Sequence, residues 1–174
     1  MRQLLSLIIL CFSATLIHAQ DLTDADIKKW VTAQQAITTW AKTTDIDEEL
    51  DADKASDKPT DYSRIFSQMM ERTAKSKHYD KLVEILDDNG YSDPEKWSAM
   101  GDRIMLAYMS NEMEGQEAQL KQQMQGMRAM MNNGQIPEAQ KAMMEQVLQE
   151  GTNALEAAAK APASDKKVVK RNEA

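Results

Sequence analysis

Apolar residues recur along most of this chain at spacings of three and four positions, which is the period of an amphipathic helix. The first such stretch follows Thr23, and an acidic Asp26 stands three positions later. This pair has the pattern of a capping box, and Leu22 and Ile27 can form a hydrophobic staple around it. The pattern therefore predicts a helix over residues 24–42, with its apolar side facing a core.

Two shorter amphipathic stretches follow, over residues 61–74 and 76–90. Gly90 is placed to end the second of them in the left-handed conformation that glycine adopts most easily. His78 lies in the first turn of this second stretch, and we expect it to be an exposed surface residue rather than a ligand. Both stretches predict helices that pack by one apolar side.

The next stretch, residues 94–114, is apolar on more than one side. Asp93 followed by Pro94 is a strong helix start, because proline fits the first helical position. Met105 and Met109 lie on a flank of this helix. Its main apolar stripe consists of Trp97, Gly101, Ile104 and Tyr108. A helix that is apolar on most sides is surrounded, so we predict that it is central or that it binds something with its second apolar side. Close approach of a neighbouring helix would explain the glycine at position 101.

Two further helices are predicted beyond Gly115, over residues 116–131 and from Pro137 to about residue 160. The residues between them, Asn132-Asn133-Gly134, are a typical helix stop. The first helix carries a stripe of Leu120, Met124, Met127 and Met131. The second carries a stripe of Met143, Val147, Gly151, Ala154 and Ala158, with Met144, Leu148 and Leu155 beside it. We expect an antiparallel hairpin with a seam of methionine, alanine and glycine.

No stretch of the chain alternates convincingly with the period of a β-strand. The sequence therefore predicts an all-α fold, a small helical bundle of five or six helices with a Met-rich C-terminal helical hairpin. Residues 20–160 have the length of a single helical domain. Residues 161–174 end in a short basic run, and we expect them to form a disordered basic tail.

The first 19 residues have the three parts of a secretory signal peptide. Arg2 supplies the positive charge, residues 4–17 are apolar, and Ala19 offers a small residue at the cleavage position. No later segment approaches the length of a membrane span. We therefore expect residues 1–19 to be a signal peptide, and the mature protein to be periplasmic or secreted, without a membrane span.

The composition of the mature protein excludes several functions. Removal of Arg2 from the 21 basic residues leaves 20, against 28 acidic residues, and the resulting net charge of −8 disfavours a nucleic-acid partner. Removal of Cys11 leaves no cysteine, which excludes a thiol nucleophile and a cysteine-based zinc site. His78 is then the only histidine, which makes the usual histidine-based catalytic mechanisms difficult to build.

Residues 43–60 are acidic and poor in apolar side chains, and we expect them to form a solvated linker. Asp45-Ile46-Asp47 begins like a calcium-binding EF-hand loop. The match fails at Leu50, where such a loop needs glycine, and at Ser56, where it needs a bidentate glutamate. We therefore expect no metal site in this segment.

No catalytic constellation is recognisable. Glu112 and Glu114 are two positions apart and do not share a helix face, and nothing places a second carboxylate opposite either of them. Ser98 and Ser110 have no histidine at a recognisable spacing. We therefore expect neither enzymatic activity nor a cofactor.

Methionine is the one compositional oddity that bears on function. The mature chain keeps 12 of the 13 methionines, and ten of them lie between Met100 and Met144. Methionine fills irregular gaps in a core, but Met-rich faces also bind varied apolar partners because they repack at low cost. The candidate partner-binding residues are Met105, Met109, Met113, Leu120, Met124, Met127 and Met131.

The leading hypothesis is an exported, non-catalytic protein that acts by binding another exported or envelope protein, as an adaptor, a chaperone-like binder or an inhibitor. One alternative is a periplasmic Cu(I)-binding protein, because thioethers are soft ligands and Met105, Met109 and Met113 recur at every fourth position. The methionines of a helix stripe that packs into a core have the same spacing, and no histidine or cysteine is available as a further copper ligand. A further alternative is a carrier of a small ligand.

Overall fold

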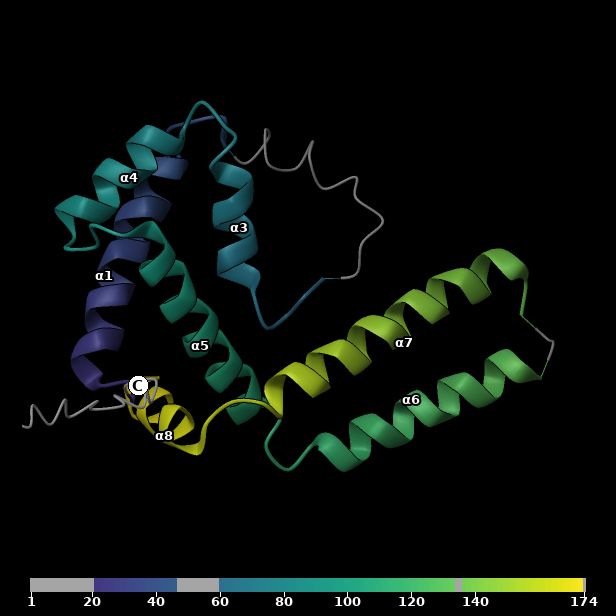
Figure 1. Ribbon diagram of the computed structural model, residues 1–174. Helices are drawn as coiled ribbons and strands as arrows, with labels where there is room; N and C mark the ends of the chain where they lie inside the picture. Colours follow the sequence, from purple (N-terminus) through teal and green to yellow (C-terminus); the bar gives the residue numbers. More distant parts are fainter. Residues whose placement is uncertain (1–20, 47–59, 134–135, 174) are drawn as a thin grey trace, which may run out of the picture.

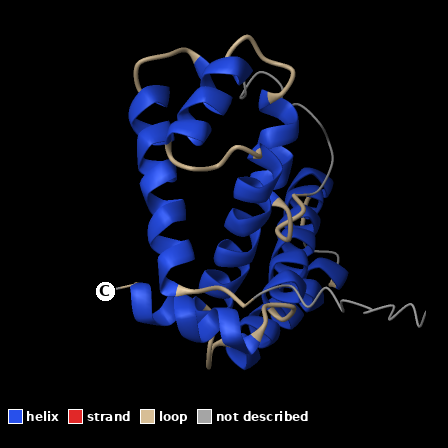
Figure 2. Cartoon of the chain, turned by 60° about the vertical axis from the view of Figure 1, so that its left-hand side comes forward, coloured by secondary structure: helices blue, strands red, loops and turns tan. Residues whose placement is uncertain are grey.

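The computed structural model describes residues 21–46, 60–133 and 136–173 (Figure 1). Within these ranges the secondary structure is entirely helical, and no strand occurs (Figure 2). The helices are α1 (Asp24–Ala41), α3 (Ile65–Thr73), α4 (Tyr79–Asp88), α5 (Pro94–Glu112), α6 (Glu117–Asn132), α7 (Glu138–Ala158) and α8 (Ala163–Asn172). The predicted all-α class is confirmed for these residues. The predictions for the signal peptide and for most of the acidic linker fall on residues outside the described ranges.

The helix starts that the sequence indicated are present. The Thr23 side chain accepts a hydrogen bond from the backbone N–H of Asp26, and the Asp26 carboxylate accepts one from the backbone N–H of Thr23. Asp93 caps α5 through the backbone N–H of Glu95, and Pro94 occupies the first turn. These caps satisfy N–H groups that have no partner inside the helix.

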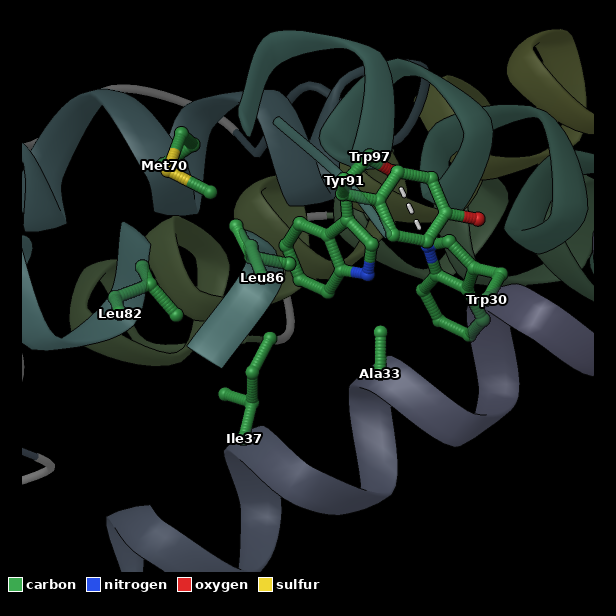
Figure 3. Close-up of a cluster of buried hydrophobic side chains, with 8 residues drawn as sticks. All are labelled: Trp30, Ala33, Ile37, Met70, Leu82, Leu86, Tyr91 and Trp97. Carbon is green, nitrogen blue, oxygen red and sulfur yellow. Dashed lines mark hydrogen bonds between the residues drawn. The ribbon is translucent and has the colours of Figure 1, made fainter. Parts of the chain in front are cut away.

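Helix α5 is the central element, as predicted, because it contacts α1, α3, α4, α7 and α8. Trp97 of α5 is fully buried and stacks on Trp30 of α1 with ring centroids 5.8 Å apart. The indole N–H of Trp30 donates a hydrogen bond to the carbonyl oxygen of Trp97 (Figure 3). Figure 3 shows the other six side chains of this cluster, which are Ala33, Ile37, Met70, Leu82, Leu86 and Tyr91.

The close approach predicted at Gly101 is also present. A Cβ atom on Gly101 would lie 2.8 Å from the Phe66 ring and 2.9 Å from the Trp30 ring. These two rings meet edge to face at 4.9 Å. Only glycine leaves room for both rings against α5, which compensates for its poor helix propensity.

Two buried carboxylates fasten helices to α5. Asp102 accepts hydrogen bonds from the backbone N–H groups of Phe66 at 2.7 Å and Ser67 at 3.3 Å, so α5 caps the start of α3. Asp165 of α8 is fully buried and receives two hydrogen bonds from the Arg103 guanidinium, each at 3.0 Å. These contacts join segments that lie more than 30 residues apart in the sequence.

The prediction of a disordered tail over residues 161–174 is wrong for residues 163–172. These residues form α8, which raises the number of described helices to seven instead of five or six. Val168 and Val169 are buried in a second apolar cluster with Leu22, Ile27 and Ala107. The basic residues around Val168 and Val169 favoured the prediction of disorder. The burial of these two valines depends on residues far away in the sequence.

The prediction that His78 is exposed is also wrong. Its side chain is 12% exposed, and its Nε2 atom lies 2.9 Å from the Asp45 carboxylate. The ring also packs edge to face on Trp40. Trp40 at the end of α1 and Asp45 in the turn after it therefore cover His78, which the sequence pattern had placed on the surface.

Helices α6 and α7 lie side by side and extend away from the other described helices (Figure 1). We call them the projecting pair, and we call α1, α3, α4, α5 and α8 the body. The α7 stripe predicted to face α6 is wrong in part, because Met143 is 68% exposed and Val147 is 52% exposed. Leu148 is buried instead, with Met144 and Leu155 half-buried beside it. The leucine-bearing side of α7 offers more apolar area to bury than the side with glycine and alanine.

Candidate functional site

The body contains an apolar pocket between α1, α3, α5 and α8. Its volume is about 230 Å³. We call it the apolar pocket, and its walls are Ile27, Trp30, Val31, Phe66, Ile104, Met105, Tyr108, Val169, Asn172 and Glu173. Eight of these ten residues are hydrophobic, so the pocket favours an apolar group over a charged one.

Helical spacing positions the walls of the pocket. Ile27, Trp30 and Val31 of α1 stand at i, i+3 and i+4. Ile104, Met105 and Tyr108 of α5 stand at i, i+1 and i+4, so each set lies on one side of its helix. The rings of Trp30 and Phe66, which both line the pocket, pack edge to face against each other. The pocket is therefore formed by rigid elements rather than by loops.

The rim of the pocket is open to solvent. Tyr108 is 44% exposed, which corrects its predicted place on the main buried stripe of α5. The buried side of α5 at this level is at Ala107, which packs against α1 and α8, while Tyr108 faces the pocket. Val31 is likewise exposed at the opposite wall. Exposed apolar side chains around a concave apolar site are typical of a binding surface.

A shallower basin continues the pocket along α1 and α8. It shares Ile27, Val31 and Asn172 with the pocket and adds Lys28, Thr32 and Arg171. Hydrogen bonds from Asn172, and then from Arg171, hold the pKa of Asp24 below its ordinary value. Charges of both signs therefore surround the pocket, and they give no preference for an anionic or a cationic ligand.

The structure separates the seven candidate residues into two groups. Met105 lines the apolar pocket, and Met109 and Met113 follow it along α5 as half-buried side chains. The other four residues lie on α6, all half-buried: Leu120, Met124, Met127 and Met131. Met124 lies against α7, because a Cβ atom on Gly151 would lie 3.7 Å from its sulfur. The pocket and the α6 stripe are therefore distinct surfaces.

Several residues of the pocket were not predictable from the sequence. Val31 and Tyr108 were assigned to no site, and Val169 and Asn172 were placed in a disordered tail. Val31 stands next to Trp30 in the amphipathic pattern and gave no separate signal. The part of the pocket wall that α8 supplies depends on the ion pair between Asp165 and Arg103, which holds this helix against α5.

Several charged and polar residues in and just after α5 have structural partners. Asp102 caps α3, Arg103 binds Asp165, and the Ser98 hydroxyl donates to the backbone carbonyl of Glu95. Glu114 forms an ion pair with Lys170 at 2.9 Å. Among the described residues no group of three or more His, Cys, Asp or Glu side chains is arranged to hold a metal ion.

In the part of the chain that the structure describes, no helix has the length and apolar character needed to cross a membrane. No protein-family model matches the sequence, and no curated protein or solved structure matches it either.

Proposed function

We propose that the protein is exported and non-catalytic, and that it acts by binding another protein through the apolar pocket of the body. The observation that carries this proposal is the open pocket itself, with apolar walls on rigid helices and exposed Tyr108 and Val31 at its rim. Protein interfaces commonly depend on one or two large apolar side chains that insert into such a pocket. At about 230 Å³ the pocket has the size for an anchor of this kind.

The partner is expected to present a large apolar or aromatic side chain on a polar surface. The mixed charges around the basin would contact the polar surroundings of that side chain at the interface rim. An adaptor, a chaperone-like binder or an inhibitor would all use a site of this type. The Met-rich helical hairpin of α6 and α7 extends the molecule beyond this site and adds a second apolar surface.

The experiment is a capture of binding partners from envelope extract, with the tagged mature protein cross-linked and analysed by mass spectrometry. The test variant is Met105→Glu, which places a charge in the pocket wall. The matched control is Ala99→Glu, which adds the same charge at an exposed position of the same helix, outside the pocket. Circular dichroism checks that both variants remain folded.

We expect the wild type and Ala99→Glu to capture the same partner in stoichiometric amounts, and Met105→Glu to lose it. Equal capture by both variants would show that the pocket is not the binding site. If the wild type captures no partner protein, the proposed function is wrong.

A small-ligand carrier is the second candidate, because the same pocket would suit a small apolar molecule. Its volume is below the range usual for drug-sized ligands, about 300–1,000 Å³, which favours a protein side chain as the occupant. Native mass spectrometry of the protein purified from its own cells separates the two candidates. A bound small molecule that Met105→Glu loses would support the carrier.

A further inference from the structure

The projecting pair has one charged side and one uncharged side. Residues placed at 100° steps around α6 and α7 put seven of the eight charged side chains on the same side of the pair. A contact across the pair confirms how the two helices are aligned, because Arg128 of α6 donates to the Thr152 hydroxyl of α7 on this charged side. The eighth, Glu150, lies at the outer edge of the opposite side.

That opposite side is the uncharged face, which we define by Gln123, Gly126, Met130, Met143, Val147 and Ala154. Its three large apolar side chains are all exposed, with Met130 at 60%. Met124 lies level with Gly151, and the helices run in opposite directions (Figure 1), so Met130 lies level with the segment between Met143 and Val147. The three side chains therefore form one patch, in the half of the pair that is far from the body.

The side chains of the uncharged face become smaller along α7 toward the body. Met143 and Val147 stand in the half far from the body, and Ala154 follows in the half near it. On α6 the face contains Gly126, where a Cβ atom would meet nothing within 4 Å. Large side chains at one end and small ones at the other form a surface that fits its own copy when that copy is turned end for end.

We propose that the uncharged face binds the same face of a second copy of this chain, turned end for end, to form a four-helix bundle. Val147 of each copy then lies over Ala154 of the other, and the two bodies stand at opposite ends. Small residues near the middle let the helices approach closely. The charged sides of both pairs remain in water, as in other bundles of this type.

Charge and area also favour a second copy. The chain has a net charge of −7, so the repulsion between two copies is smallest when they meet on the face whose only charged side chain is Glu150 at its outer edge. A pair whose shorter helix has 16 residues is about 24 Å long and about 20 Å wide, which gives about 500 Å² per copy. The total of about 1,000 Å² is near the lower limit for a specific interface, so a reversible dimer is expected.

Sedimentation equilibrium of the purified protein over a range of concentrations tests the proposal. We expect a monomer–dimer equilibrium in the wild type. Val147→Glu and Ala154→Lys, which each place an unpaired charge in the interface, should raise the dissociation constant about tenfold or more. The matched control is Ala142→Glu, which adds a charge at an exposed position of α7 that faces away from α6, and it should leave the constant unchanged.

The decisive sample is an equimolar mixture of Val147→Glu and Ala154→Lys. In a mixed dimer the new carboxylate of one copy faces the new ammonium of the other, so the mixture should dimerise more tightly than either variant alone. This result separates end-for-end pairing from other associations, and it requires only that both variants keep their helix content by circular dichroism.

A wild type that stays monomeric at every soluble concentration would overturn the proposal. So would a Val147→Glu variant with the dissociation constant of Ala142→Glu, or a mixture no tighter than its components. None of these outcomes bears on the apolar pocket, because Met105 lies in the body and its capture experiment has a separate readout.

Discussion

The body and the projecting pair bury apolar side chains in different ways. The body packs the Trp30 and Phe66 rings against Gly101, and the carboxylates of Asp102 and Asp165 join its helices. The projecting pair has no buried residue on α6, and its seam consists mainly of half-buried thioethers and leucines. The body is therefore specified by directional contacts, whereas the projecting pair is held by adaptable ones and leaves apolar surface for a partner.

The largest effect on the body is expected from Asp165→Ala. This change leaves the Arg103 guanidinium without its buried carboxylate and releases α8 from α5. Loss of one partner of a buried ion pair is strongly destabilising, and we expect a loss of about 3 kcal/mol in the free energy of unfolding. Urea denaturation measures it. In a double-mutant cycle with Arg103→Ala, strictly additive losses would show that the ion pair does not hold α8.

A pair of glycine substitutions sharpens the comparison. Gly101→Ala places a methyl group against the Phe66 and Trp30 rings, and it should destabilise the body by about 2 kcal/mol. Gly126→Ala on α6 meets open space, and it should stabilise the helix by about 0.5–1 kcal/mol because alanine has the better helix propensity. Thermal unfolding at low protein concentration measures both. Effects of the same sign would contradict the packing described for α5.

A smaller effect is expected from Asp102→Ala, which removes the cap that α5 supplies to α3. The backbone N–H groups of Phe66 and Ser67 lose their acceptor, at a cost of about 1–2 kcal/mol. Asp102→Asn is the matched control, because it keeps one acceptor oxygen, and it should lose less. Urea denaturation of both variants checks the order. Equal stability of the alanine variant and the wild type would exclude this capping role.

The smallest expected effect is the pH dependence of stability that comes from the ion pair between Glu114 and Lys170, in the last turn of α8. The hydrogen bond from Lys170 holds the pKa of Glu114 below its ordinary value, and the same bond raises the pKa of Lys170. The contribution of Glu114 is present above the ordinary carboxyl pKa and is lost as the pH falls through the lowered value. The contribution of Lys170 is lost as the pH rises through its raised value.

Both side chains are exposed, so the ion pair is weak and salt should reduce it further. The melting temperature of Lys170→Ala, measured from pH 3 to pH 7, should therefore approach that of the wild type at the acid end. A difference between the two proteins that grows toward acid pH would contradict the assignment of this ion pair.

Features that depend on neighbouring residues were predictable from the sequence. Thr23 with Asp26, and Asp93 with Pro94, signal helix starts within a few positions, and both starts are present. The close approach at Gly101 followed from a glycine on an apolar helix stripe. Each of these predictions needed only the periodicity of one helix.

Features that depend on distant partners were not predictable in this way. Helix α8 is held by Arg103, 62 positions away, and His78 is covered through Asp45, 33 positions away. The apolar pocket was missed for the same reason, because one of its walls belongs to α8. On α7, two adjacent stripes were both apolar, and only the packing on α6 decides that Leu148 is buried while Val147 is exposed.

The central claim is that the apolar pocket of the body receives a side chain of a partner protein. Hydrogen exchange of the protein alone and in its captured complex tests this claim most directly. We predict slower exchange in the complex for residues 27–31 of α1 and 104–108 of α5, which form the pocket walls. Unchanged exchange in both segments, with protection elsewhere in the chain, would contradict it.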